Sequence, residues 1–404
     1  MLCFFLILSA IFSYVVCQML PSPRYLQASA LVDARFYFFG GYTSINSSFT
    51  NEVWYLDLSD ITTTSWHKDA DMPVEYVLGS ACVSPIDNST VLLVGGKMNT
   101  PNGHSNSSEI NIFNSNNSQW KRPKVRLSNI ATARIDISVV SKNDGKIFIL
   151  GGISPDSAAW YDDMIIFDFT VMAWSKVSQL NGLKYADYTA TLLPTGLIIY
   201  IGGRYNGKNT LAKMDNILIF DTKSSSWSNK IASGVSIGSR VGHSAVLTLN
   251  GSIIIYGGTS DDSNLGPQVL PDIAVLDVNS WAWSNPKISQ TNAPPSLTFH
   301  SAALYGNYMI ITFGRITSTF AVKSNNMTLN NNIYILDTQN YTWINTTKNT
   351  SEKGKFNYIL LFGIGALLVA FSLVVVLIYK FKTRRQRQFK KTNSIHDTLN
   401  DERI

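Results

Sequence analysis

The sequence predicts an all-β fold, a six-bladed β-propeller, followed by a single transmembrane α-helix. Three observations predict the propeller. Glycine pairs recur about every fifty residues after apolar runs, an Asp or Asn ends the next apolar run, and a Trp follows a few residues later. Units of about fifty residues with roughly four short strands each are typical of propeller blades. The helix is predicted from one long uncharged segment near the C-terminus.

Each repeat contains a glycine pair, or a relic of one, directly after an apolar run. In residues 197–203, for example, LIIYI is followed by Gly202 and Gly203. The first glycines of the pairs, spaced by 55, 56, 51, 55 and 57 residues, are Gly40, Gly95, Gly151, Gly202, Gly257 and Gly314. Arg315 stands where the second glycine of the sixth pair is expected, so we expect a looser last turn.

Two further columns keep register with the glycines. The residues that end the following apolar run are Asp57, Asn114, Asp168, Asp221, Asp277 and Asp337. The tryptophans, six residues later in five repeats and after a longer loop in the first, are Trp66, Trp120, Trp174, Trp227, Trp283 and Trp343. The apolar runs are continuous rather than alternating, so we expect strands two and three to be buried on both faces. A Trp on the outer strand suits the gap that widens between blades.

These columns resemble the kelch repeat, whose marks are the Gly-Gly, an Asp several residues on and the spaced Trp. The resemblance covers roughly residues 24–347 and implies an interaction domain rather than catalysis. The blades are predicted at residues 24–75, 76–129, 130–182, 183–237, 238–296 and 297–347. We expect six blades, because the flanking residues are too few for a seventh of about fifty residues. The ring would close by packing the sixth blade on the first.

Strand one of each blade is expected to carry small residues, because it lies nearest the axis. The small pairs are Ser29–Ala30, Ser80–Ala81, Thr189–Ala190, Ser244–Ala245 and Ser301–Ala302. A polar column precedes strand three, at Glu52, Glu109, Asp163, Asn216, Asp272 and Asn332. A calcium ring is one interpretation of this column, but a repeated polar residue at a strand start more often bonds to a turn.

The two ends of the chain predict a membrane protein. Residues 1–17 begin with an almost wholly apolar run, which predicts a secretory signal peptide. Residues 356–379 contain no charge, and as a helix they would span about 36 Å, against a hydrocarbon layer of about 30 Å. A juxtamembrane stalk at 348–355 precedes this segment, and a basic cytoplasmic tail at 380–404 follows it. We therefore expect a single-pass type I protein that reaches the plasma membrane through the secretory pathway.

The charge distribution excludes a nucleic-acid partner. The formal net charge is +6, and residues 380–404 contribute +5 of it, with eight Lys or Arg against three Asp or Glu. The basic residues thus form a juxtamembrane run that can contact anionic lipid. Cys3 and Cys17 fall in the predicted signal peptide, which leaves Cys82 alone and predicts no internal disulfide.

Nine N-glycosylation sequons lie between the predicted signal peptide and membrane helix, which predicts a glycosylated ectodomain. They are Asn46, Asn88, Asn106, Asn116, Asn250, Asn326, Asn340, Asn345 and Asn349. Asn46, Asn106 and Asn326 fall in loops between strands two and three, whereas Asn88, Asn116, Asn250 and Asn340 fall on the opposite rim. None lies between Asn116 and Asn250, so blades three and four are expected to be free of glycans.

An enzyme remains an alternative, because kelch propellers resemble the catalytic domain of galactose oxidase. A membrane-tethered carbohydrate oxidase of that type needs copper held by His and Tyr, with one Tyr cross-linked to a Cys. His243 and His300 occupy one column at the start of strand one, which favours a structural role. Cys82 aligns with Val246 and Leu31 in that strand's core and reads as a small hydrophobe. We therefore expect no enzymatic activity and no catalytic, cofactor-binding or metal-binding residue.

Binding is thus the expected function, and the loops between strands two and three are the place to look. Trp160, Tyr161, Arg204 and Tyr205 lie in these loops of blades three and four, and are residue types enriched at interface hot spots. The alternative is that Trp160 and Tyr161 only pack beneath their own loop. The sequence predicts a non-enzymatic cell-surface glycoprotein that binds an extracellular protein or glycan partner, in adhesion or sensing.

Overall fold

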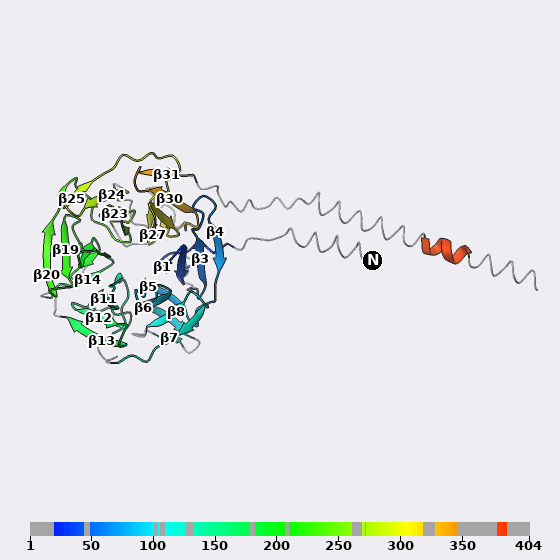
Figure 1. The fold of residues 1–404 in the computed structure, drawn as a ribbon, viewed down its shortest axis with the longest axis horizontal. Coiled ribbons are helices and arrows are strands. Elements are labelled where there is room, and N and C mark those ends of the chain that lie inside the picture. The colour runs from blue at the N-terminus through cyan, green and yellow to red at the C-terminus, as the bar shows by residue number, and fades with distance from the viewer. Residues whose placement is uncertain are drawn as a thin grey trace, which may run out of the picture. The chain divides into compact units, whose positions relative to one another are not determined.

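The computed structural model describes residues 20–43, 49–100, 103–105, 110–126, 132–177, 182–206, 210–260, 269–270, 272–317, 328–345 and 378–385. The chain divides into two compact units, residues 1–347 and 348–404, and every described strand lies in the first. Figure 1 shows these strands as sheets that radiate from a common centre. The predicted all-β, propeller-like class is confirmed.

The propeller unit is built from antiparallel four-stranded sheets, whose strands follow chain order from the centre outward. Sheet one contains β1 (Ala28–Val32), β2 (Arg35–Phe39), β3 (Val53–Asp57) and β4 (Ser65–Lys68). Sheet two contains β5 (Glu75–Val83), β6 (Thr90–Thr100), β8 (Asn111–Asn114) and β9 (Gln119–Lys121), and sheet three contains β10 (Val139–Ser141), β11 (Lys146–Leu150), β12 (Met164–Asp168) and β13 (Ala173–Val177). Sheet four contains β15 (Thr189–Leu192), β16 (Leu197–Ile201), β19 (Asn216–Asp221) and β20 (Ser226–Ile231). Sheet five contains β22 (Ser244–Leu247), β23 (Ser252–Tyr256), β24 (Ile273–Asp277) and β25 (Ala282–Ser284), and sheet six contains β27 (Ser301–Tyr305), β28 (Tyr308–Thr312), β30 (Ile333–Asp337) and β31 (Thr342–Ile344).

Short strands extend these sheets near the turns. They are β7 (Gly103–Ser105), β14 (Tyr185–Ala186), β17 (Arg204–Tyr205), β18 (Thr210–Leu211), β21 (Ser233–Gly234), β26 (Leu297–Thr298) and β29 (Arg315–Ile316). Several of them pair the segment before strand one with the segment after strand two, as β14 pairs with β17 and β26 with β29. This pairing places both segments on the same rim, which we call the loop face.

The hydrophobic core lies between neighbouring sheets. Strands two and three are buried on both faces as expected, because each face contacts an adjacent sheet. The six predicted tryptophans lie on the outermost strands, and each belongs to an apolar cluster shared by two sheets. Trp174 of β13, for example, packs with Cys82 and Leu92 of sheet two. The predicted role of the Trp column, to fill the gap between blades, is therefore confirmed.

The glycine pair adopts a left-handed turn after strand two. Gly40 and Gly41 have φ of 65° and 101°, and the Gly41 N–H donates to the Tyr76 carbonyl of the next sheet at 2.8 Å. A Cβ on Gly40 would lie 2.1 Å from the same carbonyl oxygen, so a side chain is excluded there. The glycine is thus required by the close approach of two sheets.

The sixth pair is displaced by one residue from the expectation. Phe313 and Gly314 have φ of 63° and 87°, and the Gly314 N–H donates to the Arg24 carbonyl at 2.8 Å. Gly314 is therefore the second residue of the pair and Phe313 the first, so the assignment of Gly314 and Arg315 was wrong. The Phe313 ring is fully buried, with its centre 5.0 Å from that of Phe38.

The register of strand one in sheet one is also shifted by one residue. In sheets two, four, five and six the first residue of the small pair lies two positions after a residue with positive φ, for example Ser80 after Leu78. In sheet one that residue is Leu26, so the small pair is Ala28–Ser29 rather than Ser29–Ala30. Alanine and serine are similarly small, which is why composition alone did not fix this register.

Sheet six packs against sheet one. Gln27 Nε2 donates to Ser301 Oγ at 2.7 Å, and the Leu26 N–H donates to the Phe299 carbonyl at 3.2 Å. An apolar cluster joins Phe38 and Trp66 of sheet one to Phe313. The innermost strands neighbour one another in the order β1, β5, β10, β15, β22 and β27, and β27 neighbours β1.

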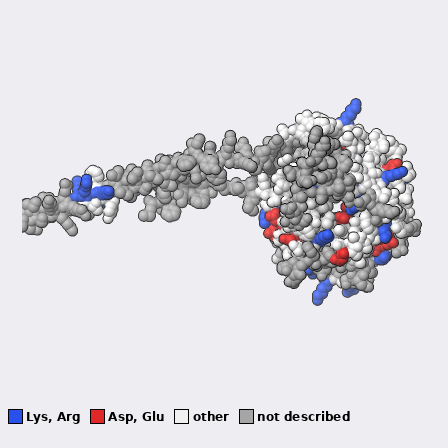
Figure 2. All heavy atoms as spheres, turned by 180° about the vertical axis from the view of Figure 1, so that it is seen from behind, with Lys and Arg blue, Asp and Glu red and all other residues white. Residues whose placement is uncertain are grey.

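Charged side chains are sparse on the propeller. Figure 2 shows basic and acidic groups interspersed among uncharged residues on one face, without a continuous basic stripe in its described part. Such a mixed surface is unlike the basic stripe that backbone recognition of nucleic acid uses.

The predicted signal peptide at 1–17, the stalk at 348–355 and nearly all of the predicted membrane segment at 356–379 lie outside the described residues. Residues 378–385 form a short helix at the start of the basic tail. None of the described helical residues forms a helix long and apolar enough to cross a bilayer.

Candidate functional site

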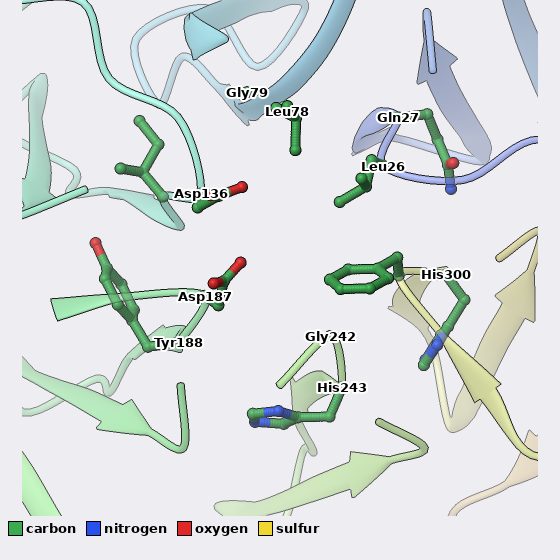
Figure 3. Close-up of a pocket in the computed structure, with 12 residues that line it drawn as sticks. Leu26, Gln27, Leu78, Gly79, Asp136, Asp187, Tyr188, Gly242, His243 and His300 are labelled. Carbon is green, nitrogen blue, oxygen red and sulfur yellow. The ribbon is translucent and has the colours of Figure 1, made fainter. Parts of the chain in front are cut away.

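A cavity of about 170 Å³ opens at the centre of the propeller unit. We call it the mouth. Its lining takes two consecutive residues from each of the six sheets: Leu26 and Gln27, Leu78 and Gly79, Asp136 and Ile137, Asp187 and Tyr188, Gly242 and His243, and Phe299 and His300. Each pair lies on the loop face: in sheet two it lies inside the long strand β5, and in the other sheets it lies just before strand one. Equivalent positions of all six repeats therefore form one site (Figure 3).

The first residue of every pair has a left-handed backbone, with φ between 55° and 64°. Only one of the six, Gly242, is a glycine. In Figure 3 the side chains of Leu26, Leu78, Asp136 and Asp187 extend toward the open centre. A non-glycine residue in this conformation costs about 1–2 kcal/mol, so five side chains are held here against a backbone penalty.

The mouth has an apolar half and an acidic half. Leu26, Leu78 and Phe299 supply the apolar half, and Asp136 and Asp187 supply the acidic half. Arg204 of β17 lies beside both carboxylates. Its Nε donates to Asp187 Oδ2 at 2.6 Å, and its Nη2 lies 3.8 Å from Asp136 Oδ2. This half of the mouth therefore holds two carboxylates beside one guanidinium.

Trp160 and Arg204, two of the predicted partner-binding residues, meet beside the mouth. The Arg204 guanidinium carbon lies 5.5 Å from the centre of the Trp160 ring. Both side chains are half-buried. We call Trp160 and Arg204 the 160/204 patch. Because Arg204 also contacts Asp187, this patch is continuous with the acidic half of the mouth.

The other two predicted residues pack on different partners. Tyr161 lies beneath the guanidinium of Arg134, with the guanidinium carbon 4.2 Å from the ring centre. Tyr205 stacks on Tyr185 with ring centres 6.1 Å apart. Both are half-buried on the same face, so they support the loops around the patch rather than joining Trp160 and Arg204.

The polar column before strand three bonds to neighbouring residues. Asp163 accepts two hydrogen bonds from Arg134, at 2.6 and 3.0 Å, and Asp272 accepts one from Ser296 at 3.0 Å. Burial alone would raise the pKa of Asp163, but the hydrogen bonds and charge of Arg134 hold it below the usual range. The described residues contain no cluster of three or more acidic, His or Cys side chains that could hold an ion. Asp163 and Asp272 thus bond to side chains 29 and 24 residues away rather than to a local turn, so neither shows the predicted turn bonding.

The predicted structural role of His243 and His300 is visible in their hydrogen bonds. His243 Nε2 lies 3.2 Å from Thr189 Oγ1, and His300 Nε2 lies 2.8 Å from Ser244 Oγ. Each bond links the start of one innermost strand to the innermost strand of the preceding sheet. The bond from Gln27 to Ser301 does the same between sheets one and six, a junction that we call the seam. Burial lowers the pKa of each histidine to about 3, so both rings are neutral at physiological pH.

Cys82 lies in the core between sheets two and three and is 8% exposed. Burial raises the pKa of its thiol to about 12, which keeps it protonated and a poor nucleophile. Within its strand it aligns with Val246 and, because of the shift in sheet one, with Ala30 rather than Leu31. These surroundings match the hydrophobic role that the sequence indicates.

Five sequons lie in described parts of the chain, and all five Asn residues are exposed. Asn88 and Asn250 lie in turns between strands one and two, and Asn116 and Asn340 in turns between strands three and four, all opposite the loop face. Asn345 follows β31. Asn46, Asn106, Asn326 and Asn349 lie outside the described residues.

Sequence reasoning missed the five non-glycine residues of the mouth that have a left-handed backbone, Leu26, Leu78, Asp136, Asp187 and Phe299. Their shared property is a backbone conformation, and their side chains have no chemistry in common. The available signal was the place of Leu26, Leu78, Asp187 and Phe299 two residues before the small pair of strand one, where Gly242 also shows the left-handed turn.

A second cavity, of about 220 Å³, lies between sheets five and six. Its walls include Tyr256, Ile273 and Trp343, together with Asn285 to Pro294 of the connecting segment. Tyr256 and Trp343 belong to the apolar cluster that joins these two sheets. We therefore interpret this cavity as a packing gap between two sheets. The mouth differs from it, because residues from all six sheets line the mouth.

Comparison with known proteins agrees with this architecture. Kelch domain-containing protein 3 of Rattus norvegicus is 28% identical over 193 residues, covering 45% of this chain and 48% of its own length. Acyl-CoA-binding domain-containing protein 5 of Arabidopsis thaliana is 22% identical over 309 residues (73% of this chain, 44% of that protein), and host cell factor of Drosophila melanogaster is 24% identical over 270 residues (61% and 17%). The chain thus spans less than half the length of these relatives.

The family comparison covers more of the chain. The sequence model of the Attractin/LZTR1 beta-propeller family matches residues 9–210 and, in a second, overlapping match, residues 91–376. The matched region includes all the described sheets, and kelch-type propellers are protein-interaction domains. The chain belongs to the Attractin/LZTR1 β-propeller family.

Proposed function

We propose that this chain is a non-enzymatic, single-pass type I cell-surface glycoprotein whose six-bladed propeller binds an extracellular protein or glycan in adhesion or sensing. The observation that carries the binding proposal is the 160/204 patch, in which Trp160 stacks near Arg204 and Arg204 bonds to Asp187 of the mouth. Half-buried Trp and Arg side chains at the rim of a cavity are the anchors that protein interfaces use most.

The closed six-bladed ring is supported by the contacts at the seam. Sheets one and six share the cluster around Phe313 and the hydrogen bond from Gln27 to Ser301. The mouth draws equivalent residue pairs from six successive repeats. A ring closed in this way needs no disulfide, because its core is continuous between all neighbouring sheets.

The cell-surface location is supported by the sequence at both ends and by the sequons. The exposed Asn88, Asn116, Asn250 and Asn340 lie on the rim opposite the loop face. Glycans on that rim would leave the mouth and the 160/204 patch accessible. The basic tail at 380–404 would contact anionic lipid on the cytoplasmic side.

The alternative of a galactose oxidase-type enzyme gains no support from the candidate ligands. His243 and His300 bond to hydroxyls of neighbouring strands, and Cys82 lies in a core between sheets. The described residues contain no group of three or more His, Cys, Asp or Glu that could hold a metal ion. Binding is therefore the function that the described residues support better.

Topology is tested with the full-length chain carrying a C-terminal tag and expressed in secretory cells. We expect a mass decrease on enzymatic removal of N-glycans, surface biotinylation of intact cells, and a tag accessible to antibody only after permeabilisation. A chain that is neither glycosylated nor biotinylated would overturn the cell-surface proposal.

Partner binding is tested by the adhesion of such cells to arrays of immobilised extracellular proteins and glycans. Trp160→Ala and Arg204→Ala are expected to reduce adhesion about tenfold or more, since hot-spot truncations cost 2 kcal/mol or more. Trp281→Ala is the matched control, because Trp281 also lies beside a cation, Lys230, but in a turn on the opposite rim. Equal loss in all three variants would contradict a site on the loop face.

A further inference from the structure

The mouth combines features that specify one kind of occupant, and this inference rests on the proposed binding function. The cavity of about 170 Å³ is equivalent to roughly six water molecules at about 30 Å³ each. That space suits one long side chain rather than a drug-sized ligand, whose pockets are typically about 300–1,000 Å³. A partner would therefore insert a single residue.

The apolar half can bury the stem of that residue. Leu26, Leu78 and Phe299 come from sheets one, two and six, which are neighbours, so their side chains form one wall. All three keep a left-handed backbone although glycine would adopt it without strain, as Gly242 does. The fold thus presents apolar surface at this position in three of the six repeats.

The acidic half favours a cation at the end of the stem. Asp136 and Asp187 lie in sheets three and four, across the cavity from Leu26 (Figure 3). Arg204 bonds to Asp187 and lies near Asp136. The residues that line the mouth include no Lys or Arg, so the two carboxylates are the charged groups of the lining.

A metal ion fits these features less well. Calcium takes six to eight oxygen ligands, and no cluster of three or more ionisable ligand side chains occurs among the described residues. Leucine and phenylalanine side chains also offer a metal no ligand. An occupant with an apolar stem and a charged tip accounts for both halves of the mouth.

We propose that the mouth receives the side chain of a lysine from an extracellular protein partner. The four-carbon stem lies along Leu26, Leu78 and Phe299, and the ammonium group donates to the Asp136 and Asp187 carboxylates. A lysine carries three donors on a compact tip, which suits a cavity of this size better than a planar guanidinium does. The 160/204 patch then contacts the residues that flank this lysine.

The test uses the purified full-length chain and four short peptides, acetyl-Gly-Gly-Xaa-Gly-Gly-amide with Xaa as lysine, arginine, norleucine or glutamate. Dissociation constants are measured by ligand-observed NMR titration. We expect lysine to bind about fivefold more tightly than norleucine, the ratio that one partly exposed ion pair of about 1 kcal/mol provides. Glutamate should bind more weakly than norleucine, and an arginine peptide should bind more weakly than lysine.

Asp136→Asn should make the affinities for the lysine and norleucine peptides equal. Asp33→Asn is the matched control, because Asp33 also has a left-handed backbone, with φ of 50°, but lies exposed in the turn at the other end of β1. It should leave the fivefold preference unchanged. Leu78→Ala should weaken lysine and norleucine binding by the same factor. This result would distinguish the contribution of the four-carbon stem to affinity from that of the ammonium group.

Equal affinity for lysine and norleucine in the unmodified chain would overturn the proposal. Loss of the preference in Asp33→Asn as well would also overturn it, because the effect would then be one of overall charge. These outcomes are independent of the proposed function, since the adhesion assay with Trp160→Ala can succeed while the lysine preference is absent. If instead lysine is preferred but adhesion fails, the mouth is a lysine site and the cell-surface partner is wrong.

Discussion

Phe313 provides a sharp test of the seam between sheets six and one. Its side chain is fully buried, and its ring centre lies 5.0 Å from that of Phe38 and 5.3 Å from that of Trp66. Truncating a buried Phe to Ala typically lowers the free energy of unfolding by about 3–5 kcal/mol. Alanine would still have to adopt the φ of 63° found at this position.

Glycine at 313 should be less damaging than alanine, although it removes one more carbon. A left-handed backbone costs a non-glycine residue about 1–2 kcal/mol, while glycine loses about 0.4–1 kcal/mol through the greater freedom of the unfolded chain. The difference leaves Phe313→Gly more stable than Phe313→Ala by up to about 1.6 kcal/mol. At Phe148, buried in the middle of β11 without a positive φ, the order should reverse, because glycine in a strand is about 0.5–1 kcal/mol worse than alanine.

Both pairs of variants can be compared by urea unfolding of the full-length chain, followed by tryptophan fluorescence. A lower unfolding free energy for Phe313→Gly than for Phe313→Ala would refute the register that places Phe313 first in the sixth pair. If the glycine variant is less stable than the alanine variant at both Phe313 and Phe148, position 313 has the backbone conformation of an ordinary strand.

Three further predictions concern buried ionisable groups. Cys82 should resist alkylation at pH 8 in the folded chain and react in urea, because burial raises the pKa of its thiol to about 12. Rapid alkylation of Cys82 in the folded chain would contradict its position in the core. The pKa of Asp163 is lowered by Arg134, so its contribution to stability is present above about pH 4 and is lost as the pH falls through the lowered pKa. Asp163→Asn should lower the free energy of unfolding at pH 7 by about 3 kcal/mol, and this loss should shrink progressively as the pH is lowered below about 4. His300 has a pKa of about 3 when folded and about 6.5 when unfolded, so stability is full above pH 6.5 and falls by about 2 kcal/mol by pH 5. His300→Gln should make unfolding less sensitive to pH over this window if it keeps the bond to Ser244, and an unchanged pH profile would argue against a neutral buried ring.

The strands and their order could be predicted because their markers are required by the backbone or by the core. A Cβ at Gly40 would collide with the Tyr76 carbonyl, so the glycine cannot be replaced there. Trp174 fills a space between two sheets that only a large side chain can fill. Residues of this kind recur at fixed spacing, and the sequence alone therefore identifies the repeat.

The predicted register was wrong where neither the backbone nor the core requires the marker residue of the repeat. At the seam, Phe313 occupies the position of a glycine, because there its ring packs on Phe38 in the first sheet. At the start of the propeller, Ala28 is as suitable near the axis as the serine found in other sheets. In both places the missing information is three-dimensional, since it depends on contacts between the first and last repeats.

The mouth shows why the candidate site was the least predictable part. Leu78, Asp136 and Gly242 occupy equivalent positions and share a backbone conformation, but they have no side-chain property in common. Their turns are held by neighbouring bonds, such as those of the Leu78 N–H to the Leu26 carbonyl and the Asp136 N–H to the Leu78 carbonyl. Because these bonds use only main-chain atoms, the side chain at each position can change without altering the fold. A propeller of this kind can therefore keep its repeat columns while the ring of six residues at its centre sets which partner it binds.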